Sequence, residues 1–278
     1  MSKSKAHADA EMVAKRPPRE ILRQEIHEGM ESMRIGALGL FISGVSAGLD
    51  IGFSPLLAAI MTTRTAGVLS LPVSEILHAN MYAVGFIFVV LGRSELFTEQ
   101  TTLAVLPVLN RSATLGSLLR LWATVYVANL LGGIGFAAVG AHVGTGLRIV
   151  DPDVFGQMAL AELDYSDGAL FTSAVLAGWL MGLLSWLVSA ARETAAQLLI
   201  VWLITWVIGF SHLHHVIAGA VPLLMAEFAG EGVGLSQIGR FLLWATLGNI
   251  LGGSVFVALI KYGQIALGSP IKEKELAA

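Results

Sequence analysis

The chain has 278 residues, of which 55% are hydrophobic and only 13% are charged, and its mean hydropathy is +0.74. Because an ordinary soluble domain has about 25% charged residues, this composition excludes a soluble globular protein and indicates a chain that crosses a membrane several times. The net charge of −3 indicates little by itself, and the absence of cysteine excludes disulfide and thiolate chemistry.

The first 34 residues lack the apolar core of a cleavable signal peptide, and their seven Lys and Arg residues predict a cytoplasmic tail. Within this tail, residues 19–34 follow the helix-breaking segment RPP at 16–18 and predict an amphipathic helix. We therefore expect three parts: a tail at 1–34, a membrane domain at 35–262 and a second cytoplasmic tail at 263–278.

Six regions are apolar and long enough to hold a membrane-crossing helix of roughly 20 residues. They are 35–61, 75–110, 117–141, 169–191, 195–226 and 238–262. Lys and Arg gather in the cytoplasmic loops of membrane proteins. If the N-terminal tail is inside, Arg64, Arg148 and Arg240 fall outside, Arg93 falls within a crossing, and the other basic residues fall inside. We expect six crossings of the cell (inner) membrane, with both termini in the cytoplasm.

The second and fifth of these regions are too long for one crossing, and each has a polar segment in its middle. The segments are RSELFTEQTT at 93–102 and SHLHH at 211–215. The pattern predicts two crossings that are each made of two half-helices joined by non-helical backbone. Such backbone cannot face lipid, so it must be buried or line a water-filled path. Paired broken helices in the two halves of a chain indicate a transport site.

An internal repeat supports this interpretation. The sequence NLLGG at 129–133 recurs as NILGG at 249–253, and each copy follows one of the polar segments. An odd number of crossings separates the copies, so the repeat is inverted. We expect the glycines to allow close helix packing, and Asn129 and Asn249 to form hydrogen bonds between helices.

Four motifs in order resemble the formate/nitrite transporter family over residues 36 to about 262. They are GRSELFTE at 92–99, WATVYVANLLGG at 122–133, HHVIAG at 214–219 and LGNILGG at 247–253. The resemblance implies an aquaporin-like, all-α fold of six transmembrane helices, a homopentamer, and one pore per protomer for small monovalent anions such as formate and nitrite.

The resemblance also implies roles for single residues. His215 takes the place of the family's central histidine, and Thr98 that of the threonine in the opposite loop. Leu96 and Phe97 take the apolar constriction, and Glu95 is expected to tether the loop by accepting hydrogen bonds.

This chain departs from the family pattern near the central histidine. His214 stands where the family has glutamate, Gly219 stands where it has asparagine, and the segment SHL at 211–213 looks inserted. His212 is therefore a rival for the central place. The family's lysine near the outer mouth also has no counterpart, because no Lys or Arg occurs between Arg148 and Arg192.

Asp50 is a second charge inside the membrane and so a candidate for function. Two interpretations remain equal: an ion pair with Arg93, or a place in the pore. Histidine changes charge near neutral pH, so a weak acid meeting His215 could gain or lose a proton and pass the constriction uncharged.

We therefore predict a channel or transporter for small monovalent anions or their protonated acids, with the bilayer and further copies of the chain as partners and no nucleic acid. The alternative is the same fold conducting a neutral solute or a cation, drawn by an acidic outer mouth. The acids of that mouth are Glu75, Asp151, Asp153, Glu162, Asp164, Asp167, Glu227 and Glu231. A metalloenzyme site built from His212, His214 and His215 is a third class, but we expect no enzyme, no metal and no cofactor, since metal sites normally need more convergent ligands.

Overall fold

The computed structural model describes residues 15–268, which form helices and no strand. In chain order the helices are α2 (Pro18–Arg34), α3 (Ala37–Ile51), α4 (Phe53–Thr65), α5 (Leu71–Gly92), α6 (Phe97–Leu103), α7 (Val105–Leu109), α8 (Leu115–Gly146), α9 (Pro152–Leu163), α10 (Asp167–Ala190), α11 (Thr194–Phe210), α12 (Val216–Ala229), α13 (Leu235–Leu251), a π-helix η1 (Gly252–Leu259) and α14 (Ile260–Leu267). The expected tail segments 1–14 and 269–278 lie outside the described residues.

Five helical stretches are long and apolar enough to cross a membrane: Ala37–Thr65, Leu71–Gly92, Leu115–Gly146, Asp167–Ala190 and Leu235–Leu267. The helices α11 and α12 are apolar but shorter. Helices thus occupy all six apolar regions of the sequence, with non-helical backbone at 93–96 and 211–215, and the prediction of an all-α membrane protein is confirmed.

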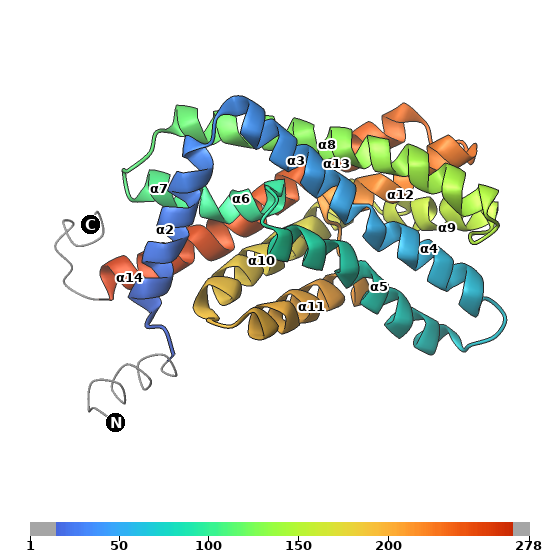
Figure 1. The fold of residues 1–278 in the computed structure, drawn as a ribbon, viewed down its shortest axis with the longest axis horizontal. Coiled ribbons are helices and arrows are strands. Elements are labelled where there is room, and N and C mark those ends of the chain that lie inside the picture. The colour runs from blue at the N-terminus through green and yellow to red at the C-terminus, as the bar shows by residue number, and fades with distance from the viewer. Residues whose placement is uncertain (1–14, 269–278) are drawn as a thin grey trace, which may run out of the picture.

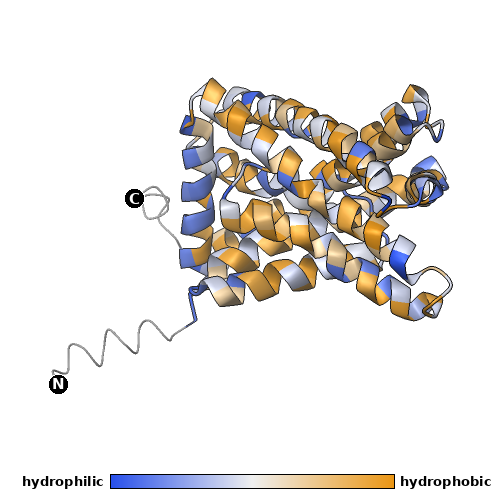
Figure 2. Ribbon diagram, turned by 45° about the vertical axis from the view of Figure 1, so that its right-hand side comes forward, coloured by the Kyte–Doolittle hydropathy of each residue, from blue (hydrophilic) through white to orange (hydrophobic). Residues whose placement is uncertain are grey.

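The long helices form a bundle with α2 across one end and α9 at the other (Figure 1). Apolar residues cover the outside of the long helices, whereas hydrophilic residues line α2 (Figure 2). Large apolar side chains such as Leu38, Val139 and Leu203 are more than half exposed. An apolar surface of this extent is unfavourable in water, so it fits contact with lipid or with other copies of the chain.

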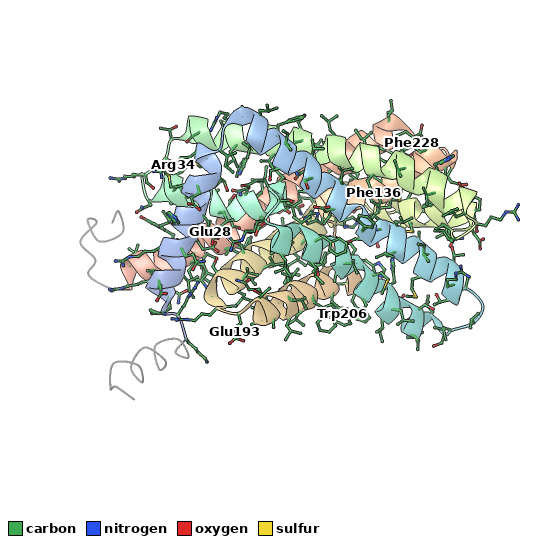
Figure 3. The ribbon with its side chains drawn as sticks, in the orientation of Figure 1. Glu28, Arg34, Phe136, Glu193, Trp206 and Phe228 are labelled. Atoms are coloured by element: carbon green, nitrogen blue, oxygen red, sulfur yellow. The ribbon has the colours of Figure 1, made fainter. Side chains whose placement is uncertain are left out.

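Gly52 separates α3 from α4 at a close contact with α8. A Cβ atom on Gly52 would lie 2.2 Å from the ring of Phe136. Phe136 also packs edge-on against Phe53, with ring centroids 4.9 Å apart, and Figure 3 labels its place on α8. The missing side chain at Gly52 therefore lets α8 approach the junction of the two helices.

Both polar segments contain non-helical backbone, but the first contains it over only part of its length. Residues 211–215 lie outside helices, as predicted, but in the first segment only 93–96 do, because α6 already begins at Phe97. The polar side chains that follow find partners within the fold: Thr101 donates to the carbonyl of Thr98 and Thr102 to that of Gly253. Satisfied polar side chains of this kind do not interrupt a helix, so the non-helical backbone is shorter than the polar segment 93–102.

Candidate functional site

Thr98 and His215 meet at the centre of the bundle. Thr98 Oγ1 lies 2.6 Å from Nε2 of His215, and the two side chains are 0% and 1% exposed. His215 Nδ1 accepts a hydrogen bond from the backbone N–H of Ala218 at 3.1 Å. Because Nδ1 acts as an acceptor, the ring is neutral and carries its proton on Nε2, which donates to Thr98. His215 thereby also caps the N-terminus of α12.

Asn129 of α8 fixes the segment between α5 and α6. Its side-chain oxygen accepts from the N–H of Phe97 at 2.8 Å, and its amide nitrogen donates to the carbonyls of Gly44 and Glu95 at 2.8 and 2.9 Å. The amide therefore ties the segment to both α8 and α3.

Asn249 of α13 does the same for the segment between α11 and α12. Its oxygen accepts from Val216 N–H at 2.8 Å, and its nitrogen donates to the carbonyls of Ala174 and His214 at 2.7 and 3.0 Å. The expectation that both asparagines bond between helices is confirmed, and the matching triads follow the inverted repeat of the sequence.

Glycines bring these helices close enough for the asparagines to reach. A Cβ on Gly48 of α3 would lie 2.1 Å from the carbonyl oxygen of Asn129, and one on Gly178 of α10 would lie 2.4 Å from that of Asn249. On the opposite helices, a Cβ on Gly132 or on Gly252 would lie 2.2 Å from a carbonyl oxygen of α3 or α10. Close packing, as expected for Gly132 and Gly252, is thus a requirement of both halves.

Apolar and aromatic side chains surround the Thr98–His215 contact. Leu96 and Phe97 are buried, and the Phe97 ring packs edge-on against Tyr126 at 4.9 Å. Phe86 of α5 packs edge-on against the imidazole of His215 with centroids 5.0 Å apart. The contact thus lies among apolar groups, where the low local dielectric constant strengthens the hydrogen bond between Thr98 and His215.

Glu95 lies on the α2 side of the first segment. Its carboxylate accepts from Ser32 Oγ of α2 at 2.8 Å and from Gln100 Nε2 at 2.5 Å, while its N–H donates to Ser43 Oγ at 3.0 Å. These bonds tie the segment to α2 and α3. No sequence pattern singles out Ser32, because a serine on an amphipathic helix is ordinary.

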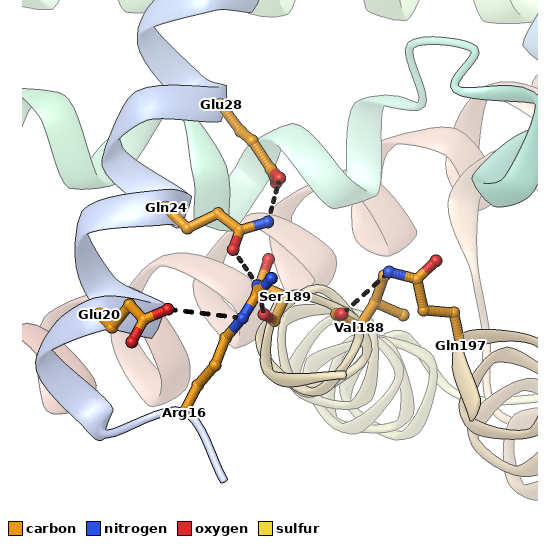
Figure 4. Close-up of polar contacts among 7 residues, drawn as sticks. All are labelled: Arg16, Glu20, Gln24, Glu28, Val188, Ser189 and Gln197. Carbon is orange, nitrogen blue, oxygen red and sulfur yellow. Dashed lines mark hydrogen bonds and ion pairs between the residues drawn. The ribbon is translucent and has the colours of Figure 1, made fainter. Parts of the chain in front are cut away.

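A cavity of about 260 Å³ lies between the first segment and α2. Its charged lining residues are Glu28, Glu31, Arg93, Glu95 and Glu99. Figure 4 shows part of its wall, where Gln24 donates to Glu28 at 3.0 Å and Gln197 of α11 donates to the carbonyl of Val188 at 3.3 Å. This end of the bundle therefore holds a polar space beside the first segment.

The three neighbouring histidines have different surroundings. His214 is buried, and its Nδ1 lies 2.8 Å from the hydroxyl of Ser173 of α10. His212 is exposed and has a φ of 49°, the left-handed conformation of a turn. Among residues 15–268, no three His, Asp or Glu side chains are grouped so that they could hold a metal ion. Ser173 was missed, although a serine within the apolar α10 is a usable signal.

Asp50 accepts a hydrogen bond from Ser46 Oγ at 3.4 Å, one turn earlier on α3. No ion pair joins it to Arg93 in the described part of the chain, and Arg93 instead lines the cavity near α2. Of the two interpretations of Asp50, the ion pair with Arg93 is therefore not formed.

Comparison with known proteins agrees with this architecture. The family model described as formate/nitrite transporter matches residues 19–263. The chain is 33% identical to the inner membrane protein YfdC of Escherichia coli K12 over 248 residues, which cover 88% of this chain and 77% of that protein. Among solved structures, it superposes on an FNT family ion channel with a TM-score of 0.77 at 24% identity, covering 90% of this chain and 99% of the other.

A pentameric formate channel with formate bound gives a TM-score of 0.69 at 24% identity, covering 83% of this chain and 98% of the other. Both solved structures are named as channels, and the matched family is one of transporters. The expectation that the chain is no enzyme agrees with this family. With a family model matched over most of its length, the chain belongs to the formate/nitrite transporter family.

Proposed function

We propose that the chain forms a pore for small monovalent anions, or their protonated weak acids, with His215 as the central histidine and Thr98 opposite it. The hydrogen bond between these two side chains is the observation that carries the proposal. It supports His215 over His212, because His212 is exposed in a turn.

The pair offers an oxyanion two hydrogen-bond donors, the Nε2–H of His215 and the hydroxyl of Thr98. An anion entering between them exchanges their mutual bond for two bonds of its own, which offsets part of the cost of leaving water. The N-terminus of α12 lies beside His215 and adds a positive dipole end. Since Nδ1 is held by Ala218, His215 acts as a donor of a hydrogen bond, and a proton that travels with the anion comes from another group or from water.

The same proposal includes six crossings between residues 35 and 262, with α5–α6 and α11–α12 as the two broken ones. Both termini are then cytoplasmic, which places α2 at the inner end and α9 at the outer end of the pore. A homopentamer in the inner membrane follows from the likeness to a pentameric formate channel and to an inner membrane protein. The exposed apolar surface of the protomer fits contacts with both lipid and neighbouring copies.

Flux through proteoliposomes that contain the full chain tests the proposal, with formate, nitrite, chloride, ammonium and a neutral solute measured side by side. Formate and nitrite should pass, and ammonium and the neutral solute should not. His215→Leu should lower anion flux at least about tenfold, because it removes the donor from a low-dielectric site. The matched control His212→Leu should change it little. Conduction of ammonium without formate or nitrite would replace this proposal with a cation pore.

A further inference from the structure

Glu162, the second-last residue of α9, reaches the pore helix α12 next to Gly219. A Cβ atom on Gly219 would lie 2.9 Å from Oε2 of Glu162 and 2.5 Å from the ring of Phe241. The carboxylate therefore packs on the bare backbone of Gly219, one turn beyond His215. A larger residue at position 219 would need the carboxylate to move.

Other contacts place Glu162 on the column of rings that leads to His215. The imidazole of His214 lies near the backbone of Glu162, and the phenol of Tyr82 lies within electrostatic reach of its carboxylate. The rings of Tyr82 and Phe86 are 5.2 Å apart, and Phe86 packs on His215. These contacts connect the carboxyl group of Glu162 to His215 through the rings of Tyr82 and Phe86.

Within the described part of the chain, no cation forms an ion pair with Glu162. From the segment before α12 and from α5 it faces His214 and Tyr82, and His212 lies beyond His214. From α13 the packed cation is Arg240, but its guanidinium already binds Asp167 at 2.6 Å and the carbonyls of Leu163 and Tyr165.

The other charged groups around α9 have different neighbours. Arg64 is exposed near the end of α4. Glu231 packs against Gly156, nearer the start of α9, where its carboxylate oxygen would lie 2.8 Å from a Cβ. Among residues 15–268, no ion pair includes Glu162.

From this placement we propose that Glu162 is the outer selectivity residue of the pore, which admits anions when its carboxyl group is protonated and repels them when it is ionised. The inference rests on the proposed function and deepens it. Repulsion between an anion and a carboxylate is strong where water is largely excluded and weak in an open mouth. One half-buried acid of α9 that packs on α12 therefore outweighs the exposed acids of the outer face.

The protonation range of the group fits such a role. Burial raises the pKa of Glu162 from its ordinary value to about 7. The carboxyl group is then neutral in mildly acidic medium and becomes charged as the pH rises through about 7, so anion uptake should fall over that range.

The test compares formate uptake by the wild-type chain and by Glu162→Gln in proteoliposomes, with the outer pH varied from about 5.5 to about 8.5. The ratio of variant to wild-type uptake should be close to one at the acid end and rise to at least about tenfold at the alkaline end. Using the ratio cancels the pH dependence that formic acid itself brings. Asp153→Asn removes the same charge from the exposed start of the same helix, and its ratio should stay constant with pH.

Added salt gives a second criterion, because it screens exposed mouth charges but not a desolvated one. The Glu162→Gln ratio should persist at high salt. If Glu162→Gln does not assemble, Glu162→Asp keeps the charge on a shorter side chain that withdraws from Gly219. The midpoint of its uptake curve should then move to lower pH, as solvation of the carboxylate improves.

A flat Glu162→Gln ratio, an equal effect of Asp153→Asn, or an unchanged midpoint in Glu162→Asp would overturn the assignment of Glu162 while leaving anion transport intact. A wild-type chain that carries neither formate nor nitrite at any pH would instead overturn the proposed function, and this inference with it.

Discussion

The hydroxyl of Thr98 lies 2.6 Å from Nε2 of His215, although 117 residues separate the two in the chain. Each residue stands beside the start of a helix that follows non-helical backbone, and each segment is fixed by an asparagine of the next long helix. The contact therefore joins the two halves of the inverted repeat at the same structural position. It depends on the packing of both halves, so changes in either should be measurable at the other.

Replacing Thr98 with valine should weaken both stability and transport. Valine keeps the shape but removes the hydroxyl, which leaves the Nε2–H of His215 without its partner in a buried site. The cost should be about 1–3 kcal/mol in the free energy of unfolding, and formate flux should fall several-fold. Thermal unfolding in detergent and proteoliposome flux measure the two effects. Thr98→Ser retains the hydroxyl and should stay close to wild type; equal behaviour of the two variants would contradict a role for the hydrogen bond.

The two asparagine triads should be equally important for stability. Asn129→Leu and Asn249→Leu each leave a buried N–H and two buried carbonyls without their partner. Each should destabilise the fold by at least about 3 kcal/mol. Denaturation in detergent gives the measurement, and Asn110→Leu at the half-buried end of α7 is the control. A large loss in one variant and none in the other would mean that the two halves are not held in the same way.

The close helix contacts should not tolerate even a methyl group. Gly48→Ala and Gly178→Ala would place a Cβ within 2.1 and 2.4 Å of a backbone carbonyl oxygen, so the helices must separate. We expect losses of about 1–3 kcal/mol or more in each case. Gly168→Ala in the first turn of α10 meets nothing within 4 Å and should instead be neutral or stabilising by up to about 1 kcal/mol. A melting temperature of Gly168→Ala below that of Gly48→Ala or Gly178→Ala would contradict the packing.

The attachment of α2 should weaken as the pH rises. Glu25 of α2 is 0% exposed and accepts hydrogen bonds from Ser185 and Ser189 of α10. Burial raises its pKa to about 8, with a smaller contribution from Glu28 and an opposing one from the two serines. A released Glu25 would titrate near 4.5, so between about pH 4.5 and about pH 8 the docked state binds the extra proton. Docking of α2 is therefore most favourable below that range. Across the range, the free energy of docking becomes less favourable by up to about 1.4 kcal/mol per pH unit.

Hydrogen exchange of the α2 amides across this pH range, corrected for the intrinsic rate, measures the docking. Protection should fall from the acid to the alkaline end in the wild type and should vary less in Glu25→Gln, which is neutral at every pH. Glu20→Gln changes an exposed acid of the same helix and should leave the wild-type dependence intact. Protection that rises with pH would show that the sign is wrong.

The amino-acid sequence by itself determined the class of the fold and the position of its apolar helices. Burial of about 20 apolar residues per crossing is a local property, so the six apolar regions could be read directly. The repeat of Asn129 and Asn249 also predicted their role, because a polar amide in an apolar helix must find partners inside the protein. The second polar segment at 211–215 was placed correctly for the same reason: two adjacent histidines and a serine interrupt an otherwise unbroken apolar run.

The tertiary structure decided the matters that depend on which side chains meet. Residues 98–102 are polar yet helical, because partners of their side chains lie on α2 and η1. Asp50 does not pair with Arg93, because Arg93 lies at the cavity near α2. His215, and not His212, contacts Thr98. The carboxylate of Glu162 packs on Gly219. A hydrogen bond or a close contact needs two groups within a few ångströms, and residues far apart in the chain reach that distance only through the packing of the helices that carry them.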